Sequence, residues 1–511
     1  MLCSSVAIIL SAGIGSRLAP LTNTTPKCLI PVYDKSILDH QIYAMLESGI
    51  NEFVIVVGYK REMVREHLEK FKDIKIHIIE NTVYRETNNM YSLYLTFNKV
   101  EELISKKKLD TVILLNGDVV FDSTILQNML FLEGNIIASQ KDVFYEESMK
   151  ITLKENGFIN DIAKTITEQD AYGVSIDLYS FNIQGWNMLK NEVNRYIKDK
   201  QDLNKWTEVA LKDLLNNPNS SFLPHDIKDA YWFEIDNIED LKKSIITFKL
   251  NNEKKNILEK KLFIFDVDGT VKNGDTKVEG IDQLFYKIHQ NGGKYCFLSN
   301  NTSMSKTDYI KKLSDIIGIE LSKDDLYTPL DQVVRYLREK TITDIFIVGT
   351  ESVKKYFSSE NFRHDKETPG AVIVTFDTSL DYSKLATASR ILMNPSVKFI
   401  LANIDARCPT EYGFIPDAGS IAEMLKTTTE HDVDYRAGKP STEMLQTILQ
   451  TKKVSRENCV FFGDRMYTDM PMGINASILT VLVLTGETQL ENLSTEDVNK
   501  YLIMKSYTEL H

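Results

Sequence analysis

Two short apolar runs in this chain lead directly into loops of small and charged residues. The first run covers residues 6–10 and enters the loop 11–17, and the second covers residues 262–265 and enters the loop 266–270. An apolar run bounded in this way is typical of a buried strand in a parallel sheet. The chain is therefore predicted to contain two sheets, each with a polar loop at the carboxyl end of a strand.

Further apolar runs alternate with amphipathic segments along both halves of the chain. In the N-terminal half they cover residues 53–57, 74–79, 111–115, 136–139 and 174–179. In the C-terminal half they cover residues 295–298, 345–348, 372–376, 399–402, 460–462 and 479–484. This alternation predicts an α/β fold with doubly wound sheets, in which ligands bind at the carboxyl ends of the strands.

The chain is too long for a single hydrophobic core, since it has 511 residues. Residues 248–261 are rich in Asn, Lys and Glu, and they separate the two series of apolar runs. We therefore expect a first domain at 1–247, a linker at 248–261 and a second domain at 262–511.

The composition excludes several classes of partner. A formal net charge of −12 argues against nucleic acid, whose phosphates are bound by clustered Lys and Arg. The 5 cysteines lack the spacing of disulfides or metal ligands, as in proteins of a reducing compartment. No stretch approaches the about 20 apolar residues that cross a bilayer. We expect a cytoplasmic protein that acts on small molecules, and we consider a homodimer.

The first loop has the residue types of a nucleotide-binding site. Small residues let the backbone approach a triphosphate, and they are Ala12, Gly13, Gly15 and Ser16. Arg17 can bind phosphate oxygens with two N–H groups, and Lys27 adds positive charge where pyrophosphate would leave. The glycines alone would fit a tight strand-to-helix turn equally well. The two basic side chains favour phosphate binding.

Two aspartates in this half are candidate Mg²⁺ ligands. Asp118 follows the apolar run 111–115, and Asp236 follows later in the chain. Two converging carboxylates would hold Mg²⁺ against the α-phosphate. An isolated Asp at a strand end is more commonly a helix N-cap, but the order and spacing here favour a metal site.

The second loop places Asp266 and Asp268 together after a strand. Asp266 would attack phosphorus and form an aspartyl-phosphate, and Asp268 would protonate the leaving alcohol and then activate water. The expected supporting residues are Ser299 as a phosphate donor, Lys439 as the cation beside Asp266, Asp464 as a Mg²⁺ ligand together with Asp266 and Asp268, and Asp469 as a residue that orients this site.

The N-terminal half resembles the sugar-nucleotide pyrophosphorylase-type nucleotidyltransferases, and specifically the bacterial phosphocholine cytidylyltransferase branch. The matching stretches are residues 7–22, 25–27, 56–59 and 88–94. The resemblance covers residues 6 to about 245 and implies transfer of CMP from CTP to a phosphate or phosphonate monoester. It also implies that Arg17 and Lys27 bind phosphate, that Asp118 and Asp236 hold Mg²⁺, and that Asn81 reads the base.

An aromatic and acidic pocket for an ammonium head group is a further hypothesis for the acceptor. Its candidate residues are Asn88, Tyr91, Trp206, Glu208 and Glu234. The alternative is that Tyr91 packs on a helix face together with Tyr94 and Leu95.

The C-terminal half resembles the haloacid dehalogenase superfamily over residues 260 to about 500, which implies a Rossmann-like core. Stretches 349–352 and 402–405 are similar to the α/β cap of the branch that contains p-nitrophenyl phosphatases and phosphoglycolate phosphatases, and we place this cap at about 305–432. Every catalytic position of the pattern is present, so an active phosphatase is expected. Lys272 and Arg407 depart from the pattern and would alter substrate preference.

The leading hypothesis is a bifunctional cytidylyltransferase and phosphatase that supplies an activated head group for cell-surface glycan or lipid. The phosphatase is expected to act on a different phosphoester, because hydrolysis of the acceptor would waste the substrate of the transferase. One alternative is a sugar-1-phosphate nucleotidyltransferase that uses UTP or GTP. Another is a cytidylyltransferase whose C-terminal half is only a binding or dimerisation module.

Overall fold

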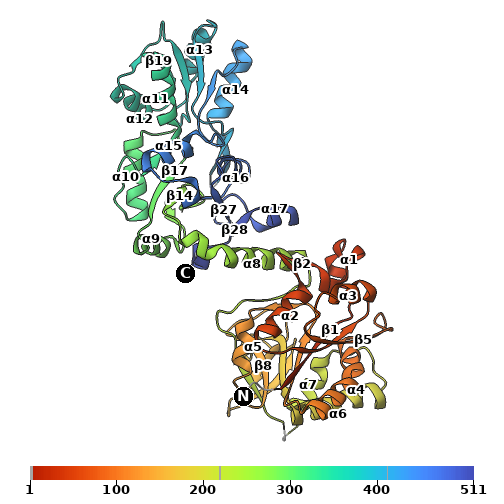
Figure 1. Cartoon of the computed structure of the whole chain (residues 1–511). Helices are drawn as coiled ribbons and strands as arrows, with labels where there is room; N and C mark the ends of the chain where they lie inside the picture. The colour runs from red at the N-terminus through yellow and green to blue at the C-terminus, as the bar shows by residue number, and fades with distance from the viewer. Residues whose placement is uncertain (1–3, 218–219, 411, 511) are drawn as a thin grey trace. The chain divides into compact units, whose positions relative to one another are not determined.

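The computed structural model describes residues 4–217, 220–410 and 412–510. The chain divides into two compact units, Met1–Phe248 and Lys249–His511, which are described separately (Figure 1). None of the helices in the described ranges combines the length and apolar character that a membrane crossing requires.

The first unit is built on a 9-stranded mixed sheet. Its main path runs β10-β9-β11-β6-β1-β4-β5, and β8 joins β11 to β12. Strands β6, β1, β4 and β5 are parallel, whereas β11 is antiparallel to β6. The strands are β1 Ser5–Ser11, β4 Glu52–Val57, β5 Lys75–Glu80, β6 Thr111–Asn116, β8 Asn135–Lys141, β9 Lys150–Leu153, β10 Ile159–Ala163, β11 Gly173–Asn182 and β12 Phe222–Asp226.

Apolar side chains on both faces of this sheet explain why its strands read as continuous apolar runs. In β1, Val6 and Ile8 point into one hydrophobic core, and Ala7 and Ile9 point into the other. The helices of this unit are α1 Leu21–Thr24, α2 Ile37–Glu47, α3 Arg61–Leu68, α4 Asn89–Lys107, α5 Ser123–Met129, α6 Ile183–Asn194 and α7 Thr207–Leu215. Short strands β2 Pro31–Val32, β3 Lys35–Ser36, β7 Val119–Phe121 and β13 Trp232–Glu234 form two further pairs.

The second unit has a core sheet of 6 parallel strands in the order β18-β17-β14-β26-β27-β28. These strands are β14 Leu262–Asp266, β17 Lys294–Leu298, β18 Leu326–Tyr327, β26 Cys459–Gly463, β27 Leu479–Val483 and β28 Leu502–Met504. The helices of this part are α9 Ile281–Gln290, α10 Lys306–Ile317, α15 Glu443–Lys452, α16 Asp469–Asn475 and α17 Thr495–Lys500. A small hairpin, β15 Lys272–Asn273 and β16 Thr276–Lys277, follows β14.

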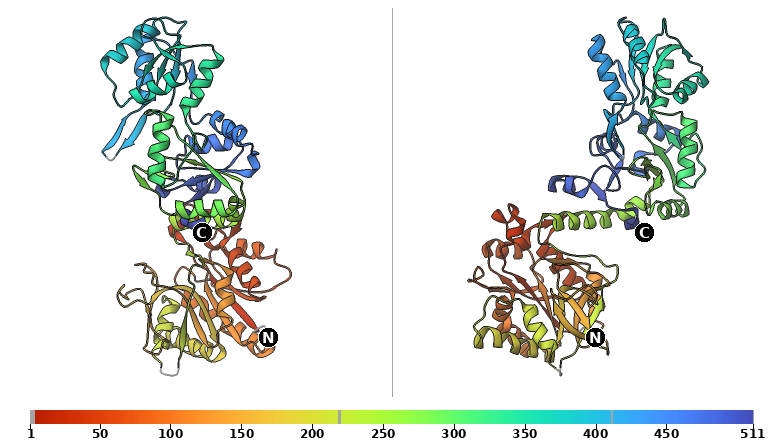
Figure 2. Two further views of the ribbon diagram at one scale, coloured as in Figure 1. Left: turned by 90° about the vertical axis from the view of Figure 1, so that its left-hand side faces the viewer. Right: turned by 180° about the vertical axis from the view of Figure 1, so that it is seen from behind.

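A second sheet within this unit forms the cap, with the order β20-β19-β21-β22-β25. Its strands are β19 Asp344–Val348, β20 Arg363–His364, β21 Ala371–Val374, β22 Lys398–Leu401 and β25 Tyr435–Arg436, and its helices are α11 Pro329–Glu339, α12 Glu351–Ser359, α13 Tyr382–Leu392 and α14 Ala418–Thr429. The light-blue hairpin of β23 Arg407–Thr410 and β24 Gly413–Pro416 projects from the cap (Figure 2).

The observed elements confirm the α/β fold class, with one mixed sheet in the first unit and two parallel sheets, in the core and in the cap, in the second. The structure differs from the expected boundaries at two places. Helix α8 Ile238–Leu258 covers most of the stretch expected as a linker at 248–261, and Leu250 and Ile257 pack into the core of the second unit. The cap does not begin near 305, because α10 packs on the core and β18 pairs with β17; it extends to β25 rather than 432.

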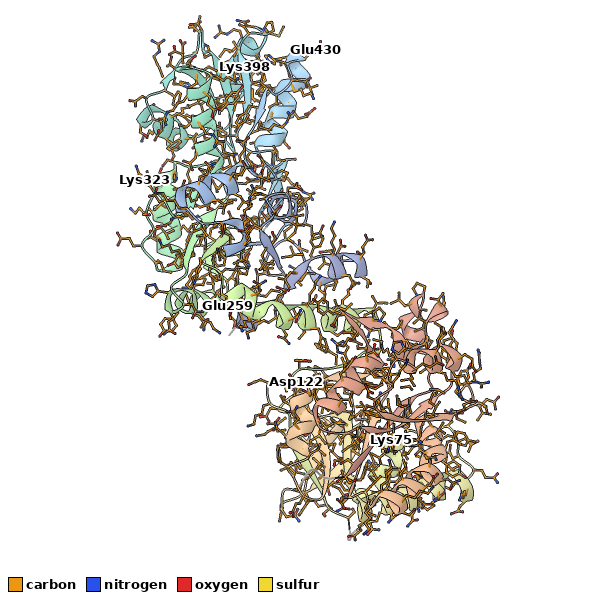
Figure 3. All side chains as sticks on the ribbon, in the orientation of Figure 1. Lys75, Asp122, Glu259, Lys323, Lys398 and Glu430 are labelled. Atoms are coloured by element: carbon orange, nitrogen blue, oxygen red, sulfur yellow. The ribbon has the colours of Figure 1, made fainter. Side chains whose placement is uncertain are left out.

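Charged side chains lie at the periphery of each unit, as Figure 3 shows for Lys75 in the first unit and for Lys323 and Glu430 in the second. All three are exposed. Buried charged groups are therefore the informative exceptions, because a charge leaves water only when it has a partner or a function.

Candidate active sites

The first unit contains a cavity of about 370 Å³ at the ends of β1 and β6. All of the expected nucleotide-binding residues line it, namely Ala12, Gly13, Gly15, Ser16, Arg17, Lys27 and Asn81. Of the expected acceptor residues, Asn88, Trp206, Glu208 and Glu234 also line it. Tyr91 is not among the lining residues; it packs against the hydrophobic core with its ring 5.9 Å from that of Tyr94, so the packing alternative is the better one for this residue.

Two glycines of the loop after β1, Gly13 and Gly15, differ in the space around their Cα atoms. A Cβ atom on Gly13 would meet nothing within 4 Å. Gly15 has φ +70°, and a Cβ atom there would lie 2.8 Å from Cβ of Lys27. Gly15 therefore lets the loop turn closely over Lys27, while the space beside Gly13 is free for a ligand.

Lys27 connects two carboxylates in this cavity. Its Nζ lies 2.8 Å from Oδ2 of Asp118 and 2.8 Å from Oδ1 of Asp236, and Arg17 lies 2.8 Å from the other oxygen of Asp236. Burial alone would lower the pKa of Lys27, but the two carboxylates outweigh burial and raise this pKa above its ordinary value. Burial would raise the pKa of Asp236, and Lys27 and Arg17 reverse that effect.

The same carboxylates have the chemistry of a divalent cation site. Ligand atoms of Asp118, Glu234 and Asp236 lie within 4.8 Å of one another. Oδ1 of Asp118 is buried and has no hydrogen-bond partner among the described residues. Three oxygen ligands with one unpartnered atom suit Mg²⁺, so these residues fit the metal that the sequence implies.

A second acidic group in this cavity was not expected from the sequence. Asp177 lies on β11 where the pairing with β8 shifts register, and its φ is +56°. The Tyr179 hydroxyl lies 2.9 Å from Asp177 and 3.2 Å from Glu208. Burial and the neighbouring Glu208 raise the pKa of Asp177 to about 8, and burial and Asp177 raise the pKa of Glu234 to about 8. The cavity therefore gathers more carboxyl groups than its three lining cations, Arg17, Lys27 and Lys164, can balance.

Asn81 is placed beside this cavity but its amide is already engaged. It donates to Thr87 at 3.0 Å and to Ser92 at 3.1 Å, and it accepts from the backbone N–H of Val83 at 3.1 Å. Both amide hydrogens are used, so a base could be read through these N–H groups only if Thr87 or Ser92 gave way. The expected base-reading role of Asn81 stays a prediction.

The second unit contains a larger cavity, of about 910 Å³, between its core and its cap. The expected residues Asp266, Asp268, Ser299, Lys439 and Asp464 all line it. Cap residues that line it include Asp405, Arg407, Cys408, Phe414 and Asp417.

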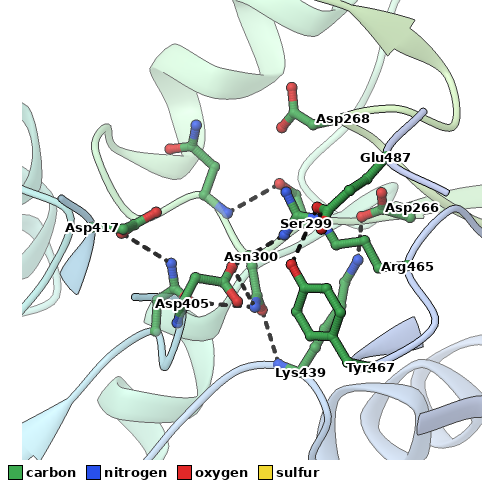
Figure 4. Close-up of polar contacts among 12 residues, drawn as sticks. Asp266, Asp268, Ser299, Asn300, Asp405, Asp417, Lys439, Arg465, Tyr467 and Glu487 are labelled. Atoms are coloured by element: carbon green, nitrogen blue, oxygen red, sulfur yellow. Dashed lines mark hydrogen bonds and ion pairs between the residues drawn. The ribbon is translucent and has the colours of Figure 1, made fainter. Parts of the chain in front are cut away.

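Lys439 is the buried cation of this site. Its Nζ contacts Asp266 (Figure 4) and lies 2.7 Å from Asp469, and both aspartates are buried. Burial alone would lower the pKa of Lys439, but the two aspartates raise it above its ordinary value. Burial raises the pKa of Asp266 to about 6, while Lys439 opposes this rise. Lys439 thus stabilises the ionised form of Asp266, and both side chains are almost fully buried.

Three buried carboxylates meet beside this lysine. Ligand atoms of Asp266, Asp464 and Asp469 lie within 4.8 Å of one another, and burial together with Asp266 and Asp469 raises the pKa of Asp464 well above its ordinary value. One lysine does not balance three carboxylates, so these residues fit a divalent cation. Gly269 makes room for this arrangement, since a Cβ atom there would lie 2.2 Å from Oδ2 of Asp464.

The carboxylate of Asp268 lies outside that cluster, which differs from its expected role as a metal ligand. It contacts Lys272 and accepts a hydrogen bond of 3.2 Å from Tyr309 (Figure 4 shows Asp268 apart from Asp266). Asp469 was expected only to support the metal site, but it also pairs directly with Lys439.

Residues of the core and cap meet through a polar network that the sequence did not reveal. Asn300 accepts from the backbone N–H of Lys439 at 2.8 Å and donates to Asp405 of the cap at 3.2 Å. Arg465 pairs with Asp405 at 3.3 Å and with Glu487 at 3.0 Å (Figure 4). The position of Asn300 and Arg465 directly after Ser299 and Asp464 is the one sequence signal that could have identified them.

Comparisons with known proteins agree with this division. A family model described as nucleotidyl transferase matches residues 6–147. A model described as haloacid dehalogenase-like hydrolase matches residues 263–363, and a related hydrolase model matches residues 436–510. The chain therefore combines a nucleotidyl transferase domain with a haloacid dehalogenase-like hydrolase domain, and it is an enzyme.

Individual relatives match about half of this chain. A 5'-nucleotidase, YutF of Bacillus subtilis, is 27% identical over 239 residues, which are 47% of this chain and 92% of the relative. Phosphoglycolate phosphatase 2 of Arabidopsis thaliana is 29% identical over 257 residues, 45% of this chain and 85% of the relative. A solved 4-nitrophenylphosphatase of Thermotoga maritima is 31% identical, covers 50% of this chain and 97% of its own, and has a TM-score of 0.46.

Proposed function

We propose that the first unit transfers CMP from CTP to a phosphate or phosphonate monoester that carries an ammonium group. The main support for nucleotidyl transfer is that Lys27 contacts both Asp118 and Asp236 in the cavity lined by Gly13 and Gly15. Lys27 and Arg17 exchange these carboxylates for phosphate oxygens when the nucleotide binds. Bound Mg²⁺, held by Asp118 and Asp236, would neutralise charge on the α-phosphate and on the leaving pyrophosphate.

An ammonium acceptor is supported by the charge and aromatic character of the cavity. Asp177, Glu208 and Glu234 line one cavity with Trp206. The ring of Trp206 already has a cation near it, because Nζ of Lys164 lies 5.2 Å from the ring centroid. An ammonium group next to these carboxylates would favour their ionised forms and gain cation–π contact.

The second unit is proposed to hydrolyse a different phosphomonoester. An oxygen of Asp266 attacks phosphorus, the bond to the leaving oxygen breaks, and that oxygen takes a proton from Asp268. Asp268 then takes a proton from water, which attacks the aspartyl-phosphate and releases inorganic phosphate and free Asp266. Ser299 donates to a phosphate oxygen, and Lys439 balances the charge of Asp266 and the phosphoryl group.

The proposal is tested by incubating the full chain with each NTP, Mg²⁺ and a panel of phosphorylated amino-alcohols, polyols and sugars. Pyrophosphate and inorganic phosphate are measured separately. We expect pyrophosphate with CTP and an amino-alcohol phosphate, and inorganic phosphate from another member of the panel. Pyrophosphate formation only with UTP or GTP and a sugar-1-phosphate would overturn the proposed specificity. Hydrolysis of the acceptor as fast as its nucleotidyl transfer would overturn the separation of substrates.

A further inference from the structure

Lys272 is buried and forms an ion pair with Asp268 that contributes little to the stability of the fold. The side chain of Lys272 is 7% exposed, whereas that of Asp268 is 45% exposed. Burying an ammonium group is costly, and an ion pair with a half-exposed carboxylate offsets little of that cost. Stability therefore does not account for this pair.

The backbone of the nucleophile loop brings Lys272 back to Asp268. Gly269 has φ +90°, and its N–H donates to the carbonyl of Lys272 at 2.8 Å. The turn places Nζ of Lys272 against Oδ1 of Asp268 and 3.1 Å from the carbonyl of Gly274. Lys272 also lines the catalytic cavity.

Tyr309 holds the other oxygen of the same carboxylate. Its hydroxyl donates to Oδ2 of Asp268 at 3.2 Å and lies 3.1 Å from the hydroxyl of Ser299. Tyr309 comes from α10 and is buried among residues of the core. Burial and the charge of Asp268 raise its pKa well above the ordinary value, so the phenol keeps its proton and remains a donor.

We propose that Lys272 and Tyr309 are positioning residues that hold the Asp268 carboxylate, one oxygen each, at the place where it serves the leaving group. The inference rests on the proposed role of Asp268 as the general acid. A carboxylate with both oxygens fixed does not rotate away between turnovers, and orientation of this kind contributes strongly to proton transfer. Because Tyr309 also contacts Ser299, the general acid and the phosphate-binding hydroxyl keep a constant separation.

The dependence of rate on the leaving group tests this inference. Phosphatase rates of the full chain are measured with 4-nitrophenyl phosphate, whose leaving group needs little protonation, and with glycerol phosphate, whose leaving group needs it. Lys272→Met and Tyr309→Phe are expected to lower kcat for glycerol phosphate by about 10-fold or more and kcat for 4-nitrophenyl phosphate by less than about 3-fold. Asp268→Asn should show the same pattern with a larger loss.

A double variant separates positioning from a structural role. Lys272→Met combined with Asp268→Asn should be no slower than Asp268→Asn alone, because Lys272 acts through Asp268. Lys312→Met is the matched control, since Lys312 pairs at 2.9 Å with the exposed Asp275; its rates should equal those of the wild type.

Equal losses on both substrates, additive losses in the double variant, or no loss in either single variant would overturn the inference. If Asp268→Asn itself showed no preference for the leaving group, the proposed general acid would be wrong. A wild type that hydrolyses neither substrate would overturn the proposed phosphatase itself.

Discussion

Asp177 has a backbone conformation and a protonation state that folding alone would not select. A positive φ is unfavourable for a residue with a side chain, and a buried carboxylate beside Glu208 is unfavourable as well. Asn116 and Tyr179 hold it at 2.9 Å each. Backbone strain and a perturbed pKa at one position of a cavity are typical of functional residues, and they favour a role for Asp177 in the proposed acceptor site.

Replacing Asp177 by Asn should weaken binding of a cationic acceptor and leave nucleotide binding intact. The KM for phosphocholine should rise by about 10-fold or more, equivalent to about 1.4 kcal/mol. The KM for CTP and the KM for an acceptor without an ammonium group, such as glycerol phosphate, should change by less than about 2-fold. Steady-state kinetics with each substrate varied in turn measure these values, and an equal rise for glycerol phosphate would contradict the proposed ammonium site.

The same variant should become more stable than the wild type as pH rises. The pKa of Asp177 is raised to about 8 in the folded protein, so between pH 4 and pH 8 the unfolded chain binds fewer protons than the folded chain at this group. The stability of the wild type therefore falls as pH rises from 4 to 8. The Asp177→Asn variant does not ionise at this position and does not lose this stability. Thermal unfolding of both proteins at pH 5 and pH 8 should show a difference in Tm that favours the variant more at pH 8.

At the scale of the element, the loop between β1 and the 3₁₀ turn Ser16–Leu18 has two glycines with different tasks. The backbone at Gly15 needs a left-handed conformation close to Lys27. Gly13 has neither a positive φ nor a close neighbour. Gly15 is therefore required by the fold, whereas Gly13 leaves room for the ligand that the loop would bind.

A pair of substitutions should separate these tasks. Gly13→Ala should keep the wild-type Tm and raise the KM for CTP, because its methyl group occupies the space of a phosphate. Gly15→Ala should lower the free energy of unfolding by about 1 kcal/mol or more and displace Lys27. Thermal unfolding and CTP kinetics measure both effects. A Gly13→Ala protein with unchanged KM would show that phosphates bind elsewhere.

At the scale of the whole molecule, each unit has its own cavity, its own carboxylate cluster and its own lysine. Lys27 contacts Asp118 and Asp236 in one, and Lys439 contacts Asp266 and Asp469 in the other. The two lysine sites share no residue, which is the physical basis for two independent reactions.

Inactivating either unit should therefore leave the other active. Asp266→Asn should abolish release of inorganic phosphate and leave pyrophosphate release within about 2-fold of wild type, because the nucleophile is lost only in the second unit. Asp118→Asn should have the reverse effect. A chelator of Mg²⁺ should stop both reactions. Loss of both activities in either variant would show that the sites depend on each other.

Local patterns predicted much of this protein. Each expected apolar run coincides with a strand to within about two residues. Most of these strands are buried on both faces, which requires apolar residues at successive positions. The residues of the two loops were also recognisable, because a phosphate needs small residues and charges close together in the sequence. Residues 248–261 misled the prediction, because few residues of this polar stretch, among them Leu250, Ile257 and Leu258, pack against a core.

The remaining features depend on contacts between distant segments. In the sequence, Asp177 looks like an ordinary strand residue. In the structure, it lies at a register shift of β11 and lines the cavity. Tyr309 resembles an ordinary helix residue in the sequence, and only the fold of α10 brings it against Asp268. The partners of the Asn81 amide hydrogens, Thr87 and Ser92, were likewise not predicted. The amino-acid sequence by itself determined the two sheets and the chemistry of their loops. Only the tertiary structure decided which polar atoms were left free, because that depends on partners that the chain brings together from far apart.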